Sequence, residues 1–237
     1  MRSLILPWAG LARWARLTSL FGAALIASCS SNDGITFVGA PTIIKVTGRI
    51  DISAEVATDA GPYVFTVTDT GGNGVQGVTV TFTIAGPATL LSTSAVTDKG
   101  GSVLTSVHFS QVAGNVAITA TAAGITTPAV VRTSSYAAPP SRLTASGGQG
   151  QSTTRGTPLP DLLSVLATDQ YNNPVVSVLI TLEATAGTLG VLSARTGADG
   201  RVTTTYTLPA TPGIQTITAS AVFNGVTRTV TFTATGT

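Results

Sequence analysis

The chain reads Thr68-Asp-Thr-Gly-Gly-Asn-Gly-Val75 in its first half and Thr168-Asp-Gln-Tyr-Asn-Asn-Pro-Val175 in its second, and this repeat decides the fold. Each copy leads into an alternating stretch, Val78-Thr-Val-Thr-Phe82 and Val178-Leu-Ile-Thr-Leu182. The copies are offset by 100 residues. A unit of that length is a whole domain rather than one turn of a solenoid. The sequence therefore predicts two similar modules in series.

Apolar residues recur at every second position in both modules, which sends alternate side chains to opposite faces of a β-sheet. The odd positions from Val103 to Phe109 and the even positions from Val202 to Leu208 are expected to face inward. Asn224-Gly225 is a signal for a two-residue hairpin. These short alternating runs, with turns about every 8 to 12 residues and no helical pattern, predict an all-β fold in which each module is a two-sheet β-sandwich.

The N-terminus carries a secretory signal peptide. Its apolar run is cut short by Arg13 and Arg16 and ends in Ile26-Ala-Ser-Cys29, whereas a membrane-spanning helix needs about 20 apolar residues. This end resembles the cleavage box of bacterial lipoproteins, which implies removal of residues 1–28 and a lipid on Cys29. The alternative is that Cys29 is only a small residue at the end of an ordinary signal. By the same resemblance, Ser30 favours an outer-membrane address.

The basic character of the sequence belongs to the signal peptide. Three of the twelve Lys and Arg residues precede Cys29 and all ten Asp and Glu residues follow it, so nine cations face ten anions in the mature chain, a net charge of −1. No basic patch remains that would bind a phosphate backbone. We therefore expect no nucleic-acid partner. The expected partners are the membrane, through the lipid, and an unknown protein or glycan.

The predicted domain plan has four parts after the signal peptide. A lipidated tether covers residues 29–40, a first Ig-like domain 41–136, a linker 137–140 and a second Ig-like domain 141–237. The linker ends in two successive prolines. Because proline fixes φ near −65°, the linker should be extended and semi-rigid.

The second module carries three motifs at residues 169–178, 196–202 and 212–219. These motifs resemble the bacterial Ig-like domains of the invasin and intimin family, over residues 143–230. The first module keeps fewer of them. Asn172 stands where the family usually has glycine, and asparagine can adopt the left-handed backbone that this position implies. The resemblance implies two tandem immunoglobulin-like β-sandwich domains with structural or adhesive roles.

No catalytic, cofactor or metal site is expected. His108 is the only histidine, and its position between two inward residues should turn it to solvent. A Ser-His-Asp triad needs a nucleophile and a carboxylate beside the histidine, and the Gly-x-Ser-x-Gly elbow does not occur in the sequence. Zinc needs three or four Cys, His or carboxylate ligands, and the sequence has only one cysteine and one histidine. We therefore expect no zinc site.

Two pairs of acids precede turns in equivalent places. Asp69 and Asp169 stand before Gly- and Asn-rich turns, and Asp98 and Asp199 precede glycine in turns that lead into strands. A calcium site would need several clustered oxygens. The simpler interpretation, which we favour, is that each aspartate accepts hydrogen bonds from the backbone of its own turn.

The tyrosines offer a candidate glycan surface, because their rings have flat apolar faces and a polar tip. Tyr63, Tyr136 and Tyr171 could form such a stacking platform, whereas Tyr206 is predicted to lie in the core. Tyr171, near the tip of a loop, is the best candidate among them for contact with a partner.

The sequence as a whole predicts a non-enzymatic, lipid-anchored envelope protein, with its tandem Ig-like domains acting as a spacer or as an adhesion and interaction module. The candidate contact loop comprises Tyr171, Asn172 and Asn173 at the tip of the second module. An exposed sheet edge that pairs with a partner strand is another route to binding. The alternative function is a periplasmic accessory or carbohydrate-binding subunit of an envelope complex.

Overall fold

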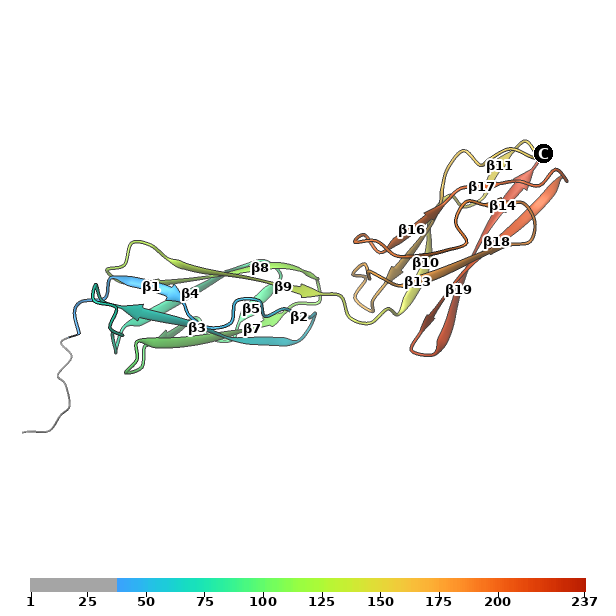
Figure 1. Ribbon diagram of the computed structural model, residues 1–237. Coiled ribbons are helices and arrows are strands. Elements are labelled where there is room, and N and C mark those ends of the chain that lie inside the picture. Colours follow the sequence, from blue (N-terminus) through green and yellow to red (C-terminus); the bar gives the residue numbers. More distant parts are fainter. Residues whose placement is uncertain (1–37) are drawn as a thin grey trace, which may run out of the picture. The chain divides into compact units, whose positions relative to one another are not determined.

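The computed structural model describes residues 38–237, and the compact unit Val38–Thr237 covers the same part of the chain. The predicted signal peptide and Cys29 lie outside the described residues. Figure 1 shows only arrows and connecting turns between Val38 and Thr237, in agreement with the predicted all-β class. Within this part of the chain, no helix is long and apolar enough to cross a membrane.

The first module consists of the strands that run from blue to green in Figure 1. They pair into a four-stranded sheet of order β1-β3-β7-β5 and a five-stranded sheet of order β2-β9-β8-β4-β6. The strands are β1 (Ile43–Val46), β2 (Ala54–Glu55), β3 (Asp59–Thr68), β4 (Thr79–Ala85), β5 (Ala88–Leu90), β6 (Ser94–Val96), β7 (Ser102–Phe109), β8 (Gly114–Ala122) and β9 (Ala129–Tyr136).

The second module follows with the strands coloured from yellow to red. They pair into sheets of order β10-β12-β16, β14-β17 and β11-β19-β18-β13-β15. The strands are β10 (Arg142–Gly147), β11 (Gln151–Thr153), β12 (Leu163–Thr168), β13 (Leu179–Ala184), β14 (Thr188–Leu189), β15 (Ser193–Arg195), β16 (Arg201–Thr204), β17 (Tyr206–Thr207), β18 (Gly213–Phe223) and β19 (Val226–Gly236).

The two modules share one strand order. The sheet β11-β19-β18-β13-β15 repeats β2-β9-β8-β4-β6 strand for strand, and in both sheets the first pairing is parallel. The other sheet differs, because β7 is continuous and pairs with β3 back to Asp59, whereas its counterpart is divided into β16 and β17. Pro158 and Pro160 precede β12 in the second module. The segment before β12 still contacts β17, through an isolated bridge between Pro158 and Thr207 and a bond from the Leu159 N–H to the carbonyl of Tyr206. β17 also pairs with β14, as β7 pairs with β5.

Each module encloses its own hydrophobic core between its sheets. The first core cluster runs from Ile44 to Val131 and the second from Leu159 to Ala234, with no residue in common. In the first, the rings of Phe65 and Phe82 pack at a centroid distance of 5.5 Å. The predicted inward positions are all buried, at Val103, Thr105, Val107, Phe109, Val202, Thr204, Tyr206 and Leu208. The alternation therefore predicted the faces of these strands correctly.

Two turn predictions are confirmed by the backbone. Asn224 and Gly225 have φ values of 50° and 79° and join Phe223 directly to Val226, as expected for a two-residue type I′ turn. Asn172 adopts the left-handed backbone with φ of 70°, where Gly72 of the first module has 83°. These residues tolerate positive φ because asparagine and glycine meet the smallest steric penalty there.

Candidate functional site

In the first module, the most polar site is the turn that follows β3. The Asp69 side chain is 4% exposed. Its Oδ1 accepts the N–H of Gly71 and of Asn73, both at 2.9 Å. Its Oδ2 accepts the N–H of Gly39 at 2.8 Å and lies 3.2 Å from Asn73 Nδ2. The carboxylate thus binds both its own turn and the segment that enters the module.

The turn that follows β12 repeats this arrangement around Asp169, which is 0% exposed. Its Oδ1 accepts the N–H of Tyr171 and of Asn173, both at 2.8 Å. Its Oδ2 accepts the N–H of Ala138 at 3.0 Å and the side-chain amide of Asn173 at 2.8 Å. The predicted turn caps at Asp69 and Asp169 are therefore confirmed. In addition, each carboxylate binds the segment that precedes its module, at Gly39 in the tether and at Ala138 in the linker.

These hydrogen bonds favour the charged form of the first carboxylate. The pKa of Asp69 is lowered from its usual range, first by the backbone N–H of Gly39 and then by the backbone and side chain of Asn73. An aspartate saturated by N–H donors has few lone pairs left for a cation. No three His, Cys, Asp or Glu residues cluster as a metal site within residues 38–237.

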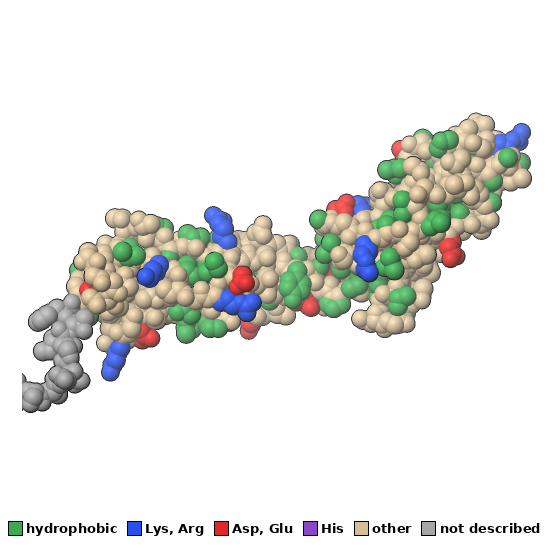
Figure 2. All heavy atoms as spheres, viewed as in Figure 1, with side chains coloured by type: hydrophobic (Ala, Val, Ile, Leu, Met, Phe, Trp, Pro, Cys, Tyr) green, Lys and Arg blue, Asp and Glu red, His purple; other side chains and the backbone are tan. Residues whose placement is uncertain are grey.

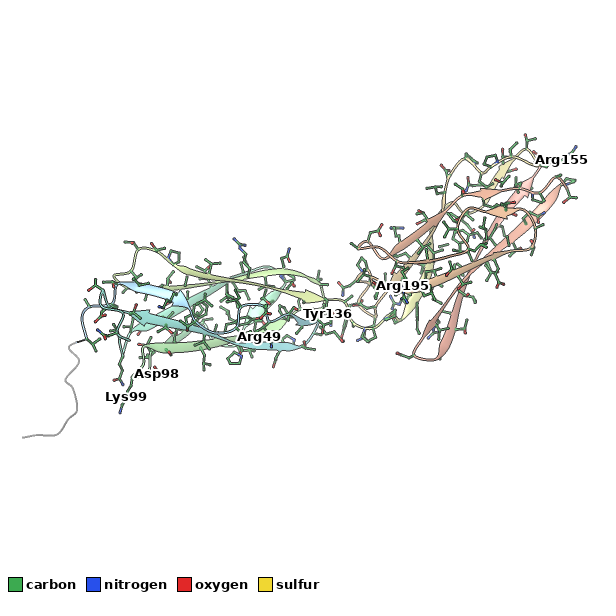
Figure 3. All side chains as sticks on the ribbon, viewed as in Figure 1. Arg49, Asp98, Lys99, Tyr136, Arg155 and Arg195 are labelled. Carbon is green, nitrogen blue, oxygen red and sulfur yellow. The ribbon has the colours of Figure 1, made fainter. Side chains whose placement is uncertain are left out.

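The second pair of acids caps the turns that lead into β7 and β16. Asp98 Oδ1 accepts the N–H of Gly100 and of Ser102, both at 2.8 Å. Asp199 Oδ1 accepts the N–H of Arg201 at 3.1 Å. Figure 3 labels Asp98 with its neighbour Lys99 at this turn of the first module. Both acids thus serve as the predicted caps.

Asn173 reaches beyond its own module. Its Oδ1 accepts the N–H of Ala113 at 2.8 Å, and its Nδ2 donates to the carbonyl of Gln111 at 2.7 Å. Residues 111–113 connect β7 to β8 of the first module. Asn173 is 6% exposed. The loop that the sequence placed at a tip of the second module thus touches the first module, because its amide binds the backbone there.

The other two residues of the candidate contact loop are more accessible. Asn172 is exposed, and its Oδ1 accepts from Arg142 Nη1 at 2.5 Å. Tyr171 is half-buried. Contact of this loop with an external partner stays a prediction for Tyr171 and Asn172.

The candidate tyrosine platform is wrong for Tyr63. Its ring is 0% exposed in the first core, and its Oη lies 3.1 Å from Thr133 Oγ1 and 3.2 Å from the carbonyl of Ile52. Tyr136 is exposed at the end of β9, where Figure 3 labels it. Tyr206 is 1% exposed, so its predicted place in the core is confirmed.

His108 faces solvent, as predicted. Its Nδ1 lies 2.6 Å from Asp59 Oδ1, and the two side chains are 48% and 65% exposed. Between exposed groups, such a pair contributes little to stability. His108, near the end of β7, therefore lies on the outer surface of the sheet.

The described part of the chain has several open hollows on its surface. One, of about 680 Å³, is lined by residues 51–53 and by the neighbouring ends of β4, β8 and β9. A second, of about 450 Å³, is lined by Pro140, by residues 175–179 at the start of β13 and by residues 220–222 of β18. Arg195, labelled in Figure 3, also lines it, and its Nη1 donates to the carbonyl of Ser177 at 2.7 Å. A third, of about 430 Å³, lies over residues of β6 and β7. Figure 2 shows charged side chains spread over the visible face, some of them in adjacent acidic and basic pairs, among polar and apolar ones.

Comparison with known proteins agrees with this architecture. Residues 50–134 match the family model of the bacterial Ig-like domain (group 1). The match falls on the first module, although the motifs noted above are more complete in the second. A search of curated proteins found no significant match.

Several solved structures are similar at low identity. The D0-D1 domain of intimin is 22% identical, with 81% of this chain and 98% of that chain covered and a TM-score of 0.33. The Escherichia coli adhesin FdeC is 17% identical, with 84% and 66% covered and a TM-score of 0.45. InvD of Yersinia pseudotuberculosis is 17% identical, with 79% and 57% covered and a TM-score of 0.49. The chain thus spans about two thirds or less of the last two structures.

Residues 50–134 are therefore similar to the bacterial Ig-like domain (group 1), and the second module that follows has the same order of strands.

Proposed function

We propose that this protein is a non-enzymatic, lipid-anchored component of the cell envelope whose two Ig-like modules act as a structural spacer or an adhesion and interaction module. The observation that carries the proposal is the repeated loop. In both modules its Asp and Asn side chains bond to the backbone of the turn and of the incoming chain. The recurring polar residues therefore maintain the path of the chain, which is what a spacer requires.

The anchor is the part of the proposal that rests on sequence alone. Cys29 is the only cysteine, and it ends a stretch that resembles a lipoprotein cleavage box. A lipid on Cys29 would tie the tether, residues 29–40, to a membrane, with the outer membrane as the proposed address. Each buried methylene of the acyl chains adds about 0.8 kcal/mol of membrane affinity.

Metabolic labelling with an alkyne-bearing palmitate tests this anchor. The wild-type chain should incorporate the label and fractionate with outer membranes, and Cys29→Ala should lose both properties. Accessibility to protease in intact cells then separates the cell surface from the periplasmic face. A soluble, unlabelled wild-type protein would rule out the lipid anchor.

The two proposed roles, spacer and interaction module, differ in whether function depends on particular surface residues. A spacer should keep its function when residues 141–237 are replaced by an unrelated β-sandwich of equal length. An interaction module should lose it, and should lose cross-linked partners when Tyr171 or Asn172 is changed to Ala. A glycan array with the full chain checks the carbohydrate-binding alternative, for which saturable binding that Tyr171→Ala abolishes is required.

A further inference from the structure

We infer that Asn173 is a positioning residue that locks the second module onto the β7–β8 connection of the first. Its side-chain amide both accepts a hydrogen bond from that connection and donates one to it. Oδ1 accepts the N–H of Ala113 at 2.8 Å, and Nδ2 donates to the carbonyl of Gln111 at 2.7 Å. An amide satisfied on both sides by backbone groups has one orientation only.

The amide of Asn173 is also fixed by a hydrogen bond within its own module. Nδ2 also donates to Asp169 Oδ2 at 2.8 Å, so both of its protons and its oxygen are engaged. Asp169 Oδ2 in turn accepts the N–H of Ala138 in the linker at 3.0 Å. Asn173, Asp169 and Ala138 are 6%, 0% and 3% exposed. One buried carboxylate and amide thus connect the linker, the loop of the second module and the loop of the first.

The first module supplies an internal comparison. Asn73 occupies the equivalent place and its Nδ2 lies 3.2 Å from Asp69 Oδ2. Within residues 38–237, the bonds of the Asn73 side chain stay inside its own turn. The Asp-Asn pair alone therefore serves the turn, and the two additional bonds to Gln111 and Ala113 are the feature that distinguishes Asn173.

The sequence also shows which strand connection has the backbone donor that this contact needs. Ala113 precedes Gly114 at the start of β8, and the residue that precedes Gly213 at the start of β18 is Pro212. Proline has no N–H. The β17–β18 connection of the second module therefore lacks the donor that Ala113 provides. Ala113→Pro would remove the same donor from the β7–β8 connection, which makes it a probe of this hydrogen bond.

The test is a distance measurement by pulsed electron spin resonance on the full chain. Spin labels are attached through Thr83→Cys and Glu183→Cys, two exposed and equivalent strand positions, with Cys29→Ser to remove the only other thiol. The unaltered joint should give a narrow distance distribution. Asn173→Ala should broaden it at least about twofold, whereas Asn73→Ala, which removes only the bonds within a turn, should leave the width unchanged.

A second pair of variants keeps the inference testable if Asn173→Ala fails to fold. Ala113→Pro removes the N–H while leaving the second module untouched, and Ala113→Ser retains it. Broadening with proline and a native width with serine support the lock. A width in Asn173→Ala or Ala113→Pro equal to that of the unaltered joint overturns it, and so does equal broadening by Asn73→Ala. The result does not depend on the lipid anchor or on any partner.

Discussion

The carboxylate of Asp169 accepts a hydrogen bond from the backbone N–H of Ala138, 31 residues earlier in the chain, at 3.0 Å. The same carboxylate holds two N–H groups of its own turn and the amide of Asn173. Replacing Asp169 by Ala leaves these buried donors without an acceptor, and each unsatisfied donor costs about 1–3 kcal/mol. We expect Asp169→Ala to destabilise the second module by about 3–4 kcal/mol and lower its melting temperature by at least about 10 °C.

Calorimetry of the full chain, with hydrogen exchange to assign each transition, measures this loss. Asp199→Ala is the matched control, because its carboxylate is exposed and accepts one turn N–H, and it should cost less than about 1 kcal/mol. The melting temperature should not respond to calcium. A large calcium-induced rise that requires Asp169 would instead make this turn a metal site.

Acid should weaken the first module through Asp69. Its pKa is lowered in the folded state, first by the N–H of Gly39, so folding favours the charged carboxylate. That contribution is fully present above the unfolded value of about 4 and is lost as the pH falls below it. Melting curves from pH 7 to pH 2.5 should therefore decline below about pH 4, and Asp69→Asn should flatten the decline attributable to this module.

Asp51 provides the control for that titration. Its pKa is also lowered, by the side chain of Arg49, but both members of this pair are exposed, at 76% and 73%. Solvent screens such a pair, so Asp51→Asn should leave the acid limb nearly unchanged. A decline in melting temperature below pH 4 that changes with Asp51→Asn but not with Asp69→Asn would contradict the role given to the hydrogen bond from Gly39.

Two buried tyrosines, one in each module, should titrate late in alkali. Burial raises the pKa of Tyr63 and of Tyr206, because the apolar core disfavours the phenolate. Since the unfolded chain ionises first, stability should fall as the pH rises above about 10. Spectrophotometric titration should show a late component that Tyr63→Phe and Tyr206→Phe each reduce and that the exposed Tyr136→Phe does not. Loss of either hydroxyl should cost about 0.5–1.5 kcal/mol of stability at neutral pH.

Much of the fold was predictable because local patterns determine it. Alternation placed Val107 and Tyr206 inward, and the Asn224-Gly225 pair fixed a tight hairpin. The repeated aspartates were predictable as turn caps, since their partners lie two to four residues away. Tyr63 could also have been placed, because it continues the odd, inward series of Phe65 and Val67 on β3.

The parts that could not be predicted depend on contacts far apart in sequence. Asn173 and Ala113 are separated by 60 residues, and nothing in the repeat distinguishes Asn173 from Asn73 except its neighbours in space. The division between β16 and β17 is similar, since its counterpart β7 is continuous although both segments have the same inward alternation. Sequence identified the chemistry of the loop but not its partner.

Ser177 occupies a position where glycine should be better. Its φ is 64°, and the equivalent Gly77 has 80°. A left-handed backbone costs a residue with a Cβ about 1–2 kcal/mol. Glycine avoids that cost but lowers the free energy of unfolding by about 0.4–1 kcal/mol, because it raises the entropy of the unfolded chain. Because Ser177 is exposed and uses only its backbone, through its N–H to Thr196 and its carbonyl to Arg195, Ser177→Gly should stabilise the second module by up to about 1 kcal/mol. Gly77→Ser should destabilise the first module by a similar amount, and Ser193→Gly, within strand β15, should destabilise the second. Denaturant unfolding measures all three, and a loss of stability in Ser177→Gly would mean that the serine side chain serves the turn in a way that its backbone angle does not reveal.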